Sequence, residues 1–171
     1  MSDKATVGIN AQILLDEIKT NWSGTYNYDI ATVLAASSGE GWIYAEKDVS
    51  ASAGAYLLGI TEDFLGSATG AGTVAVGDKL RWIAIKHTGT TDGTTATSHG
   101  VVITLDANGS NAYDDVDGIF LDSNDLIVLK VPNSTVESFH ARTCTVAGGA
   151  PAANGSAAVR VHVAAILENV G

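Results

Sequence analysis

The side chains in this sequence that could bind a metal or start a reaction are few and far apart. Four histidines and one cysteine are spread along the chain: His87, His99, His140, His162 and Cys144. His140 and Cys144 are four residues apart on a predicted strand, so they share a face, but no second ligand pair accompanies them. A structural zinc site needs about four such ligands. The sequence therefore predicts no zinc site.

Nucleophilic and phosphate-binding motifs are also incomplete. Ser98 and His99 stand beside a predicted strand, without a GxSxG turn or a third residue that would orient the histidine. The glycine-rich residues 66–77 are followed by Asp78 and Lys79 and lack the order GxxxxGK[ST] of a phosphate-binding loop. The sequence therefore predicts a protein with no catalytic residues and no organic cofactor.

An acidic stretch beyond the middle of the chain is the candidate for a metal site. Oxygen-bearing residues occupy positions 1, 3, 5, 9 and 12 of a calcium-type loop, namely Asp106, Asn108, Ser110, Asp114 and Asp117. Asn111 stands where such loops have glycine, Asp117 replaces the bidentate glutamate, and no predicted helix flanks the loop. The alternative is a solvated acidic loop between strands. Calcium added after chelation would then leave the melting temperature unchanged.

The element on which the rest of the predicted fold depends is residues 79–87. It is followed by the polar residues 88–98 and by a second apolar run at 100–105, as in two strands joined by a surface loop. Strict alternation places Leu80 and Trp82 on one face of the first run, and Ile83 and Ile85 on the other. Since both faces carry bulky apolar residues, this strand is predicted to be central and covered on both sides.

The remaining pattern is one of short strands separated by turns. Further strands are predicted at residues 26–30, 41–45, 56–61, 119–121, 126–129, 139–146 and 158–167. Residues 122–125 have the composition of a four-residue hairpin loop, and Pro132 is predicted to end the strand that follows it. About eight short strands at this spacing predict an all-β fold, a single β-sandwich or jelly-roll-like barrel.

The N-terminal region is predicted to differ from the rest. Asn10 is a suitable N-cap for a short helix that ends at Thr20. The predicted organisation is therefore an N-terminal arm with a short helix at residues 1–21 and a β-sandwich domain at residues 22–171. The candidate partner-binding residues are Ile13, Leu14, Ile18, Trp22 and Trp42. Packing of the helix on its own domain, and of both tryptophans in the core, is the alternative.

Composition limits the kinds of partner. A chain of 171 residues with 46% hydrophobic residues is long enough for one domain with a proper core. Its net charge of −10 repels phosphate backbones and anionic lipids, so binding to nucleic acid or to a membrane surface is not expected. The N-terminus lacks the basic start and apolar core of a secretion signal, and synthesis in the cytoplasm is expected.

Three stretches together resemble virion structural proteins of tailed bacteriophages. They are residues 77–90 (GDKLRWIAIKHTGT), 117–122 (DGIFLD) and 129–136 (LKVPNSTV), and the predicted strand at 158–167 fits the same pattern. The resemblance implies a non-enzymatic part of the particle, of the capsid decoration (cement) type. Such proteins are small β-rich domains, often homotrimers, that sit on the outside of the capsid and bridge subunits of the major capsid protein. An arm at one end commonly inserts into a neighbour.

Two other classes of function stay open at this point. One is a tail-fibre or baseplate adhesin domain that contacts host glycans, although the polar loops at residues 88–98 and 148–156 contain no aromatic residue to stack on a sugar. The other is a small β-barrel enzyme. It is disfavoured because no acid, base and nucleophile occur at useful spacing.

Overall fold

The computed structural model describes residues 3–14, 19–30, 39–50, 55–56, 74–105, 118–147, 150–153 and 157–169 of the chain. Most of them lie in strands, which confirms the predicted all-β fold. In chain order the strands are β1 (Asp3–Leu14), β2 (Lys19–Ile30), β3 (Gly39–Val49), β4 (Ala55–Tyr56), β5 (Lys79–His87), β6 (His99–Leu105), β7 (Ile119–Leu121), β8 (Leu126–Thr135), β9 (Phe139–Ala147), β10 (Ala150–Ala153) and β11 (Val159–Asn169). One 3-10 turn, η1 (Val136–Ser138), separates β8 from β9.

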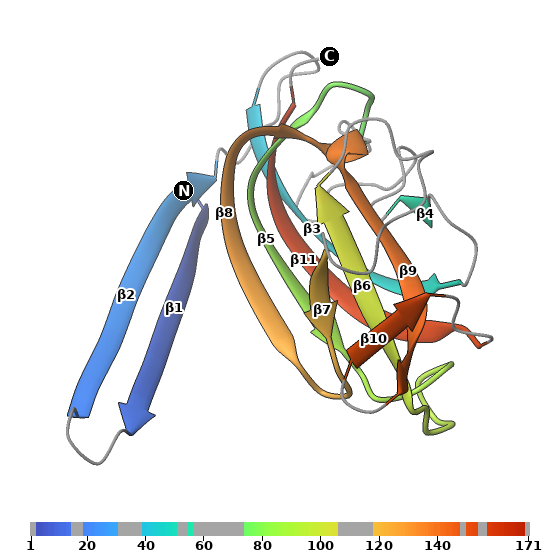
Figure 1. Ribbon diagram of the computed structural model, residues 1–171. Helices are drawn as coiled ribbons and strands as arrows, with labels where there is room; N and C mark the ends of the chain where they lie inside the picture. Colours follow the sequence, from blue (N-terminus) through green and yellow to red (C-terminus); the bar gives the residue numbers. More distant parts are fainter. Residues whose placement is uncertain are drawn as a thin grey trace.

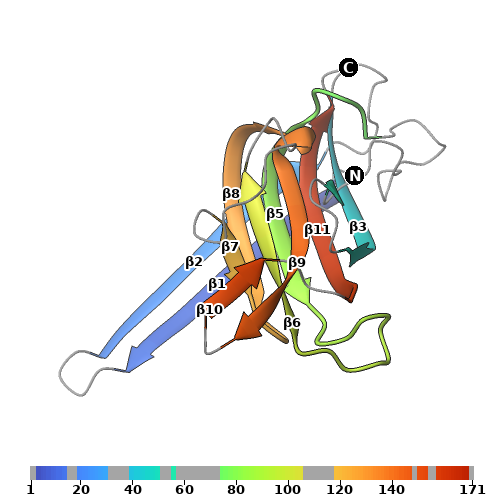
Figure 2. The ribbon, with the colours of Figure 1, turned by 45° about the vertical axis from the view of Figure 1, so that its right-hand side comes forward.

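Two antiparallel sheets form the body of the protein. Sheet I has the strand order β3-β11-β5-β8, and sheet II has the order β10-β9-β6-β7, with β4 also paired to β9. The successive pairs β3 and β4, β5 and β6, β7 and β8, and β9 and β11 each have one strand in either sheet. The orders 3-11-5-8 and 4-9-6-7 are the connectivity of an eight-stranded jelly roll, to which β10 is an addition. Figures 1 and 2 show the two sheets packed face to face.

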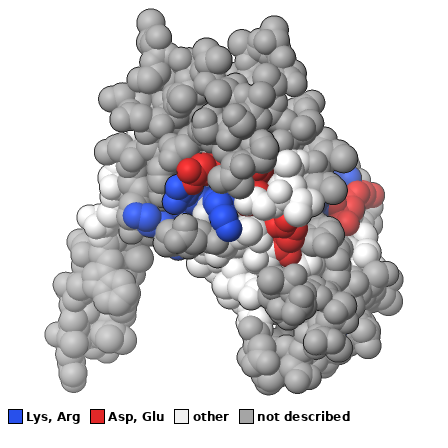
Figure 3. All heavy atoms as spheres, turned by 90° about the horizontal axis from the view of Figure 1, so that it is seen from above, with Lys and Arg blue, Asp and Glu red and all other residues white. Residues whose placement is uncertain are grey.

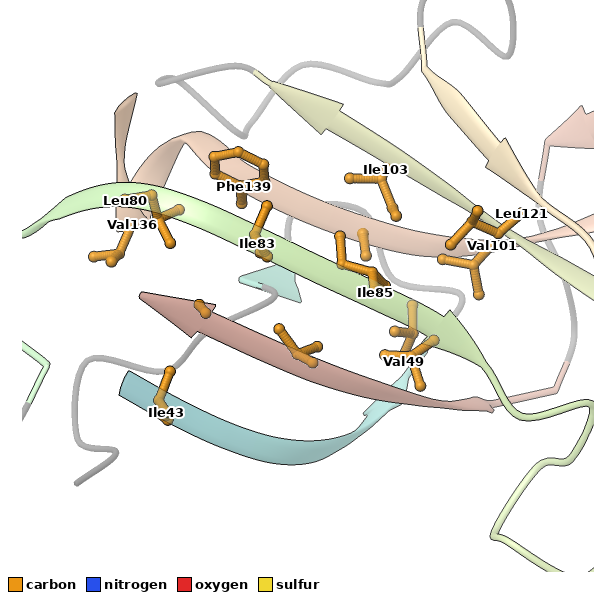
Figure 4. Packing of buried hydrophobic residues seen from close by; sticks show 14 of the residues in the cluster. Ile43, Val49, Leu80, Ile83, Ile85, Val101, Ile103, Leu121, Val136 and Phe139 are labelled. Carbon is orange, nitrogen blue, oxygen red and sulfur yellow. The ribbon is translucent and has the colours of Figure 1, made fainter. Parts of the chain in front are cut away.

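The core lies between the two sheets. Ile83 and Ile85 of β5 and Val163 of β11 meet Ile103 of β6 and Phe139 of β9 in one buried apolar cluster. Figure 4 shows that labelled residues from strands of both sheets project into this space. Such burial of apolar surface is the main favourable term in folding. The predicted strand at residues 158–167 is confirmed as part of β11, in which every second residue from Val159 to Leu167 is buried here.

The strand predicted to be central, β5, is indeed flanked by β11 and β8. Its predicted alternation is wrong at one point, since Leu80, Ile83 and Ile85 are all fully buried. The cause is a bulge: Trp82 pairs with Ile166 and Leu80 with Leu167, so Arg81 is an extra residue with no partner position in β11. A bulge shifts the side-chain alternation by one residue. The outer face of β5 is also less covered than predicted, because Lys86 is exposed.

Two turn predictions need correction. The strands on either side of residues 122–125 form as predicted, but β7 pairs with β6 and β8 pairs with β5. The segment therefore crosses from one sheet to the other and is not a hairpin loop. Pro132 does not end its strand, because β8 continues to Thr135. β8 is an edge strand of sheet I, where a residue without a backbone N–H is tolerated.

The predicted N-terminal helix is wrong. β1 and β2 pair with each other along their whole length, from Asp3 opposite Ile30 to Leu14 opposite Lys19. The sequence has apolar residues at alternate positions from Ala5 to Ile13, which is the period of a strand, and this pattern outweighs the helical spacing. The predicted strand at residues 26–30 is confirmed as the end of β2. The expected boundary after residue 21 falls inside this strand.

We call the β1–β2 hairpin the arm. Figures 1 and 2 show it projecting beside the sandwich as a separate two-stranded ribbon. The described element with which it has a substantial contact is β3, which follows it in the chain. The arm therefore extends away from the sheets that hold the core.

Candidate functional site

The residues predicted for metal chemistry are not brought together in the described part of the chain. The candidate calcium ligands Asp106, Asn108, Ser110, Asp114 and Asp117 lie at residues 106–117, outside the described residues. Within the described ranges, no group of three or more His, Cys, Asp or Glu residues is close enough to hold a metal ion. The calcium site stays a prediction.

The buried histidine His87 has a structural role. Its Nδ1 accepts a hydrogen bond from the backbone N–H of Gly89 at 2.9 Å, and its Nε2 lies 2.9 Å from the carbonyl oxygen of His99. These two bonds define a neutral ring with the proton on Nε2, which donates to the carbonyl. The ring thereby ties the end of β5 to the start of β6.

The outer face of sheet I is the described surface best suited to bind a partner. Pairing of β3, β11, β5 and β8 arranges its residues in three rows across the sheet. The rows are Trp42–Ile166–Trp82–Lys130, Tyr44–Ala164–Ala84–Val128 and Glu46–His162–Lys86–Leu126. The first two rows are almost free of charge, and the third is polar. The two almost uncharged rows therefore lie between this third row and the ion pair of Arg81 with Glu168.

We call Trp42, Tyr44, Trp82, Ala84 and Ala164 the aromatic patch. Trp42 is 38% exposed and Tyr44 is 43% exposed, although both are large apolar residues. Ala164 and Ala84 follow Tyr44 in the second row, and their small side chains keep this part of the surface low. Exposed clusters of large apolar side chains are uncommon on soluble proteins and commonly mark binding sites.

A charged group adjoins the aromatic patch. Arg160 donates two hydrogen bonds to the carboxylate of Asp48, from Nε to Oδ1 at 2.7 Å and from Nη2 to Oδ2 at 2.9 Å. Glu46 lies 3.7 Å from both Arg160 and His162, and the ring of His162 meets that of Tyr44 edge-on at 5.7 Å. The hydrogen bonds from Arg160 hold the pKa of Asp48 below its ordinary value. This group fixes β3 to β11 beside the patch.

The loop at residues 88–98 closes over the same arginine. The backbone N–H of Arg160 donates to the carbonyl of Thr90 at 2.9 Å. Asp92 in turn accepts hydrogen bonds from the backbone N–H groups of Thr95 and Thr94 and from both hydroxyls. These bonds, the backbone ones first, hold the pKa of Asp92 far below its ordinary value. The loop is therefore a hydrogen-bonded turn whose polar groups are engaged with one another.

Replacing Arg160 with methionine is expected to reduce stability at neutral pH and to matter little in acid. Asp48 has a lowered pKa when folded, so its contribution to stability is complete above the ordinary aspartate pKa of about 3.9. The contribution is lost as pH falls through the folded pKa. Urea unfolding of wild type and Arg160→Met from about pH 7 to pH 2 should show a stability difference that shrinks below about pH 4.

Lys86→Met is the matched control for this experiment. Lys86 is exposed on the same sheet face. The substitution Lys86→Met removes one positive charge, as Arg160→Met does. Its effect should be small throughout the pH range, because the two hydrogen bonds that tie Arg160 to one carboxylate have no counterpart at Lys86 among the described residues, and a single exposed charge contributes little. Equal effects of the two substitutions at neutral pH would contradict the role assigned to the Arg160–Asp48 pair.

The arm has two faces of opposite character. In the pairing of β1 with β2, alternate positions share a face. One face carries Ala5, Val7, Ile9, Ala11, Ile13, Thr20, Trp22, Gly24, Tyr26, Tyr28 and Ile30, with Asp3 at its end. The other carries Lys4, Thr6, Gly8, Asn10, Gln12, Leu14, Lys19, Asn21, Ser23, Thr25, Asn27 and Asp29. We call them the apolar and polar faces of the arm.

Gly24 marks the middle of the side on which the apolar residue types of the arm fall. Gly24 lies on this face, opposite Ile9, and it is exposed. A Cβ built on Gly24 would have no atom within 4 Å. An isolated two-stranded hairpin is marginally stable in water, and it gains stability when its apolar face packs on another layer. The arm is therefore suited to bind something outside its own sandwich.

The candidate partner-binding residues fall on both surfaces. Ile13 and Trp22 occupy positions on the apolar face of the arm, whereas Leu14 occupies a position on the polar face. Ile18 lies outside the described residues. Trp42 is on the aromatic patch, so the alternative of core packing does not hold for it.

Sequence reasoning missed most of the aromatic patch. Tyr44 follows Trp42 at the spacing of two residues that puts both on one face of a strand, and this signal was present in the sequence. Trp82 could not be assigned to the patch, because its face depends on the bulge at Arg81.

The outer face of sheet II differs from that of sheet I. Its residues Val102, His140, Arg142 and Cys144 are all buried. The view from above in Figure 3 shows described Lys, Arg, Asp and Glu side chains next to one another, not sorted by sign. On the outer face of sheet I, by contrast, the aromatic side chains of Trp42 and Tyr44 are exposed.

No protein-family model, curated protein sequence or solved structure matches this chain. In the described residues, no helix has the length and apolar character needed to cross a membrane.

Proposed function

We propose that this chain is a non-enzymatic structural protein of a tailed-bacteriophage virion. In this proposal it is made in the host cytoplasm, binds the outside of the capsid shell and stabilises it by bridging subunits of the major capsid protein. The observation that supports it best is the arm, a separate two-stranded ribbon in which the pairing places apolar and polar residue types on opposite sides. The resemblance of residues 76–136 to virion proteins gives the class of particle. The jelly-roll strand order is also one that viral capsid proteins use.

The physical case is one of repeated attachment. A chain with a net charge of −10 is repelled by other acidic proteins. Uncharged surface area is what would allow it to bind to them. The arm and the aromatic patch supply such area at two separate places on one molecule. When two contacts are made by one linked molecule, the second is intramolecular and the overall affinity rises steeply. A capsid shell presents many equivalent binding sites, so one molecule can make two linked contacts on it and gain affinity in this way.

A tail-fibre or baseplate adhesin domain is the second candidate function. Trp42 and Tyr44 are exposed on a sheet face, with polar groups from Glu46 and His162 beside them. Flat aromatic side chains with a polar neighbour are suited to pack on sugar rings. The sequence offered no aromatic residue in the polar loops, whereas the sheet face has two.

Binding to emptied, expanded phage heads tests the first function. Purified protein should sediment with the heads in a saturable manner, with a fixed number of copies per shell. A variant that lacks residues 1–30 should keep its folded sandwich and lose this attachment. Heads that bind no protein, together with glycan-array signals that disappear in Trp42→Ala, would replace the decoration function with the adhesin.

A further inference from the structure

The β8 edge of sheet I is long, apolar and open on one side. Within the described structure, β8 pairs with β5 and with no other strand. Its first residues, 126–129, carry no charge, and Leu126 keeps 62% of its surface exposed. We propose that the β8 edge pairs with the same edge of a second copy, which joins two four-stranded sheets into one continuous sheet. This contact goes beyond the proposed function, and it covers neither the arm nor the aromatic patch.

The other sheet edges in the described structure are short or charged. The strands at the edges of sheet II, β7, β10 and β4, have three, four and two residues. At the other edge of sheet I, β3 carries the consecutive charged residues Glu46, Lys47 and Asp48. Short strands and charged residues are the usual protection of a sheet edge against pairing with another chain. Residues 126–129 of β8 have neither protection.

The direction of the backbone groups in β8 follows from one hydrogen bond. The backbone N–H of His87 donates to the carbonyl of Asp125 at 2.9 Å, so Asp125 directs its carbonyl toward β5. Successive residues of a strand direct their backbone groups to opposite sides. Leu126, Val128 and Lys130 therefore direct three N–H and three C=O groups away from β5, toward what we call the free edge. Such a row of groups is a template for a further strand.

A second copy of β8 pairs with all of these groups in one register. Antiparallel pairing about a two-fold axis at Val128 places Leu126 of each copy opposite Lys130 of the other. All three pairs are then of the hydrogen-bonded type, with two bonds in each. An axis moved by one residue loses a pair, because it places Asn124 of the turn or Pro132, which has no N–H, opposite a residue of the free edge.

The charges also correspond in this register. Lys130 of each copy lies next to residues 122–125 of the other, a turn with the two carboxylates of Asp122 and Asp125 and no basic residue. All four residues of this turn are exposed, as is Lys130. The two Lys130 residues are roughly 14 Å apart, which follows from the spacing of residues and strands in a sheet. Two molecules of net charge −10 repel one another, so a contact between opposite charges determines how they can meet.

Pairing at this edge also covers core residues that one copy leaves partly exposed. Ile127, Leu129 and Val131 of β8 and Ile119 of β7 pack against the core cluster but are only partly buried. β8 and β7 are the edges of the two sheets on the same side of the sandwich (Figures 1 and 2). A second copy at this side removes apolar surface from water, which favours association.

The contact makes pairs and not rings. A two-fold contact uses the same surface on both copies, and each copy has one β8 edge. The pair therefore differs from the homotrimer that the resemblance implies. It carries two arms and two aromatic patches, which doubles the contacts that one particle can make with a shell.

The mass of the full chain in solution is the first test. Sedimentation equilibrium and light scattering over a wide range of concentrations should give twice the mass of one chain. Val128→Asp places two like charges opposite each other at the two-fold axis and should weaken the pair at least about 30-fold. Val76→Asp is the matched control, because Val76 is 67% exposed and lies outside β8, and it should leave the pair intact. A mass of one or three chains for the wild type would overturn the proposal.

Hydrogen exchange of backbone amides tests the register without any substitution. The N–H groups of Leu126, Val128 and Lys130 should be protected in the pair and should exchange rapidly after dilution to single chains. The N–H groups of Ile127 and Leu129 bond to β5, so they should stay protected at every concentration. Rapid exchange at Val128 in a sample of dimeric mass would refute the β8 contact.

An exchange of charges tests the antiparallel direction. Lys130→Glu and Asp122→Lys each bring like charges together across the contact and should weaken the pair roughly 5-fold. When the two variant proteins are mixed, opposite charges meet at both ends of the contact. The mixed pair should therefore be tighter than either variant alone, and a mixed pair no tighter than the variants would contradict this register.

These measurements separate the pair from the proposed function, because they are made without heads. Heads that bind a chain of single mass would overturn the pair and leave the proposed function standing, whereas a pair that binds no heads would do the reverse. Circular dichroism and melting temperatures of the variants must match the wild type, because a misfolded sandwich would also lose the contact. Where Val128→Asp fails this check, the exchange of the wild-type amides decides.

Discussion

Truncation of Phe139 to alanine is expected to lower the free energy of unfolding by about 3–5 kcal/mol. Phe139 is fully buried at the start of β9, and Figure 4 shows it with Leu80 and Ile83 of the opposite sheet. Removal of the ring loses its transfer free energy and leaves a cavity that two rigid sheets cannot close. Since a chain of this size loses about 2–4 °C per kcal/mol, the melting temperature should fall by roughly 6–20 °C.

Phe120→Ala is the matched control for that substitution. Phe120 of β7 is partly buried, and its ring lies over Gly100, where an added Cβ would collide with it. The same truncation at this half-covered position should cost only about 1–2 kcal/mol. Urea unfolding followed by tryptophan fluorescence and by circular dichroism gives both values. Equal losses at the two positions would contradict the central place assigned to Phe139 in the core.

The strands that could be predicted from the sequence are those in which composition and period agree. In β11, Val159, Val161 and Val163 alternate with Arg160 and His162, and the structure has the valines buried and the other two on the outer face. The all-β fold follows from many such segments. Each was recognisable because one face must be apolar and the other polar.

The pairing of strands could not be predicted in the same way. Residues 122–125 have the composition of a hairpin turn, but the strands on either side belong to different sheets. A turn between two sheets uses the same residue types as a turn within one sheet. The difference depends on partners that are distant in sequence, such as β5 for β8 and β6 for β7. Local composition carries no information about them.

The arm shows a competition between two periods. Ile13, Leu14 and Ile18 have helical spacing, and Asn10 is a good helix cap, so a short window favours a helix. A longer window, beginning at Ala5, shows alternation that continues through β1. The polar and apolar faces emerge only when β1 is paired with β2 in the correct register. The candidate site could therefore be predicted in part: Trp22 and Trp42 were named, but the surfaces they belong to were not.

The bulge at Arg81 determines which residues of β5 face the core. A deletion that changes this pattern is the second variant with a large expected loss of stability. Deletion of Ala84 is expected to destabilise the sandwich by at least about 3 kcal/mol. If the N-terminal half of β5 keeps its place, Ile85 and His87 turn away from the core and Lys86 turns into it. If the C-terminal half keeps its place, Trp82 must take the fully buried position of Ile83. Either outcome buries a charge or overfills the core.

Deletion of Arg81 should have the opposite result, although it shortens the same strand by one residue. Arg81 has no partner position in β11, so its removal leaves Leu80, Ile83 and Ile85 on the core side of a strand that pairs regularly with β11, while the irregularity between Ser134 and Lys130 of β8 remains. The loss is then limited to its ion pair with Glu168, a partly exposed contact worth at most about 1 kcal/mol. Thermal unfolding of the two deletion variants provides the comparison. A larger loss for the Arg81 deletion would mean that the twist of the bulge, and not the burial pattern it allows, is what β5 requires.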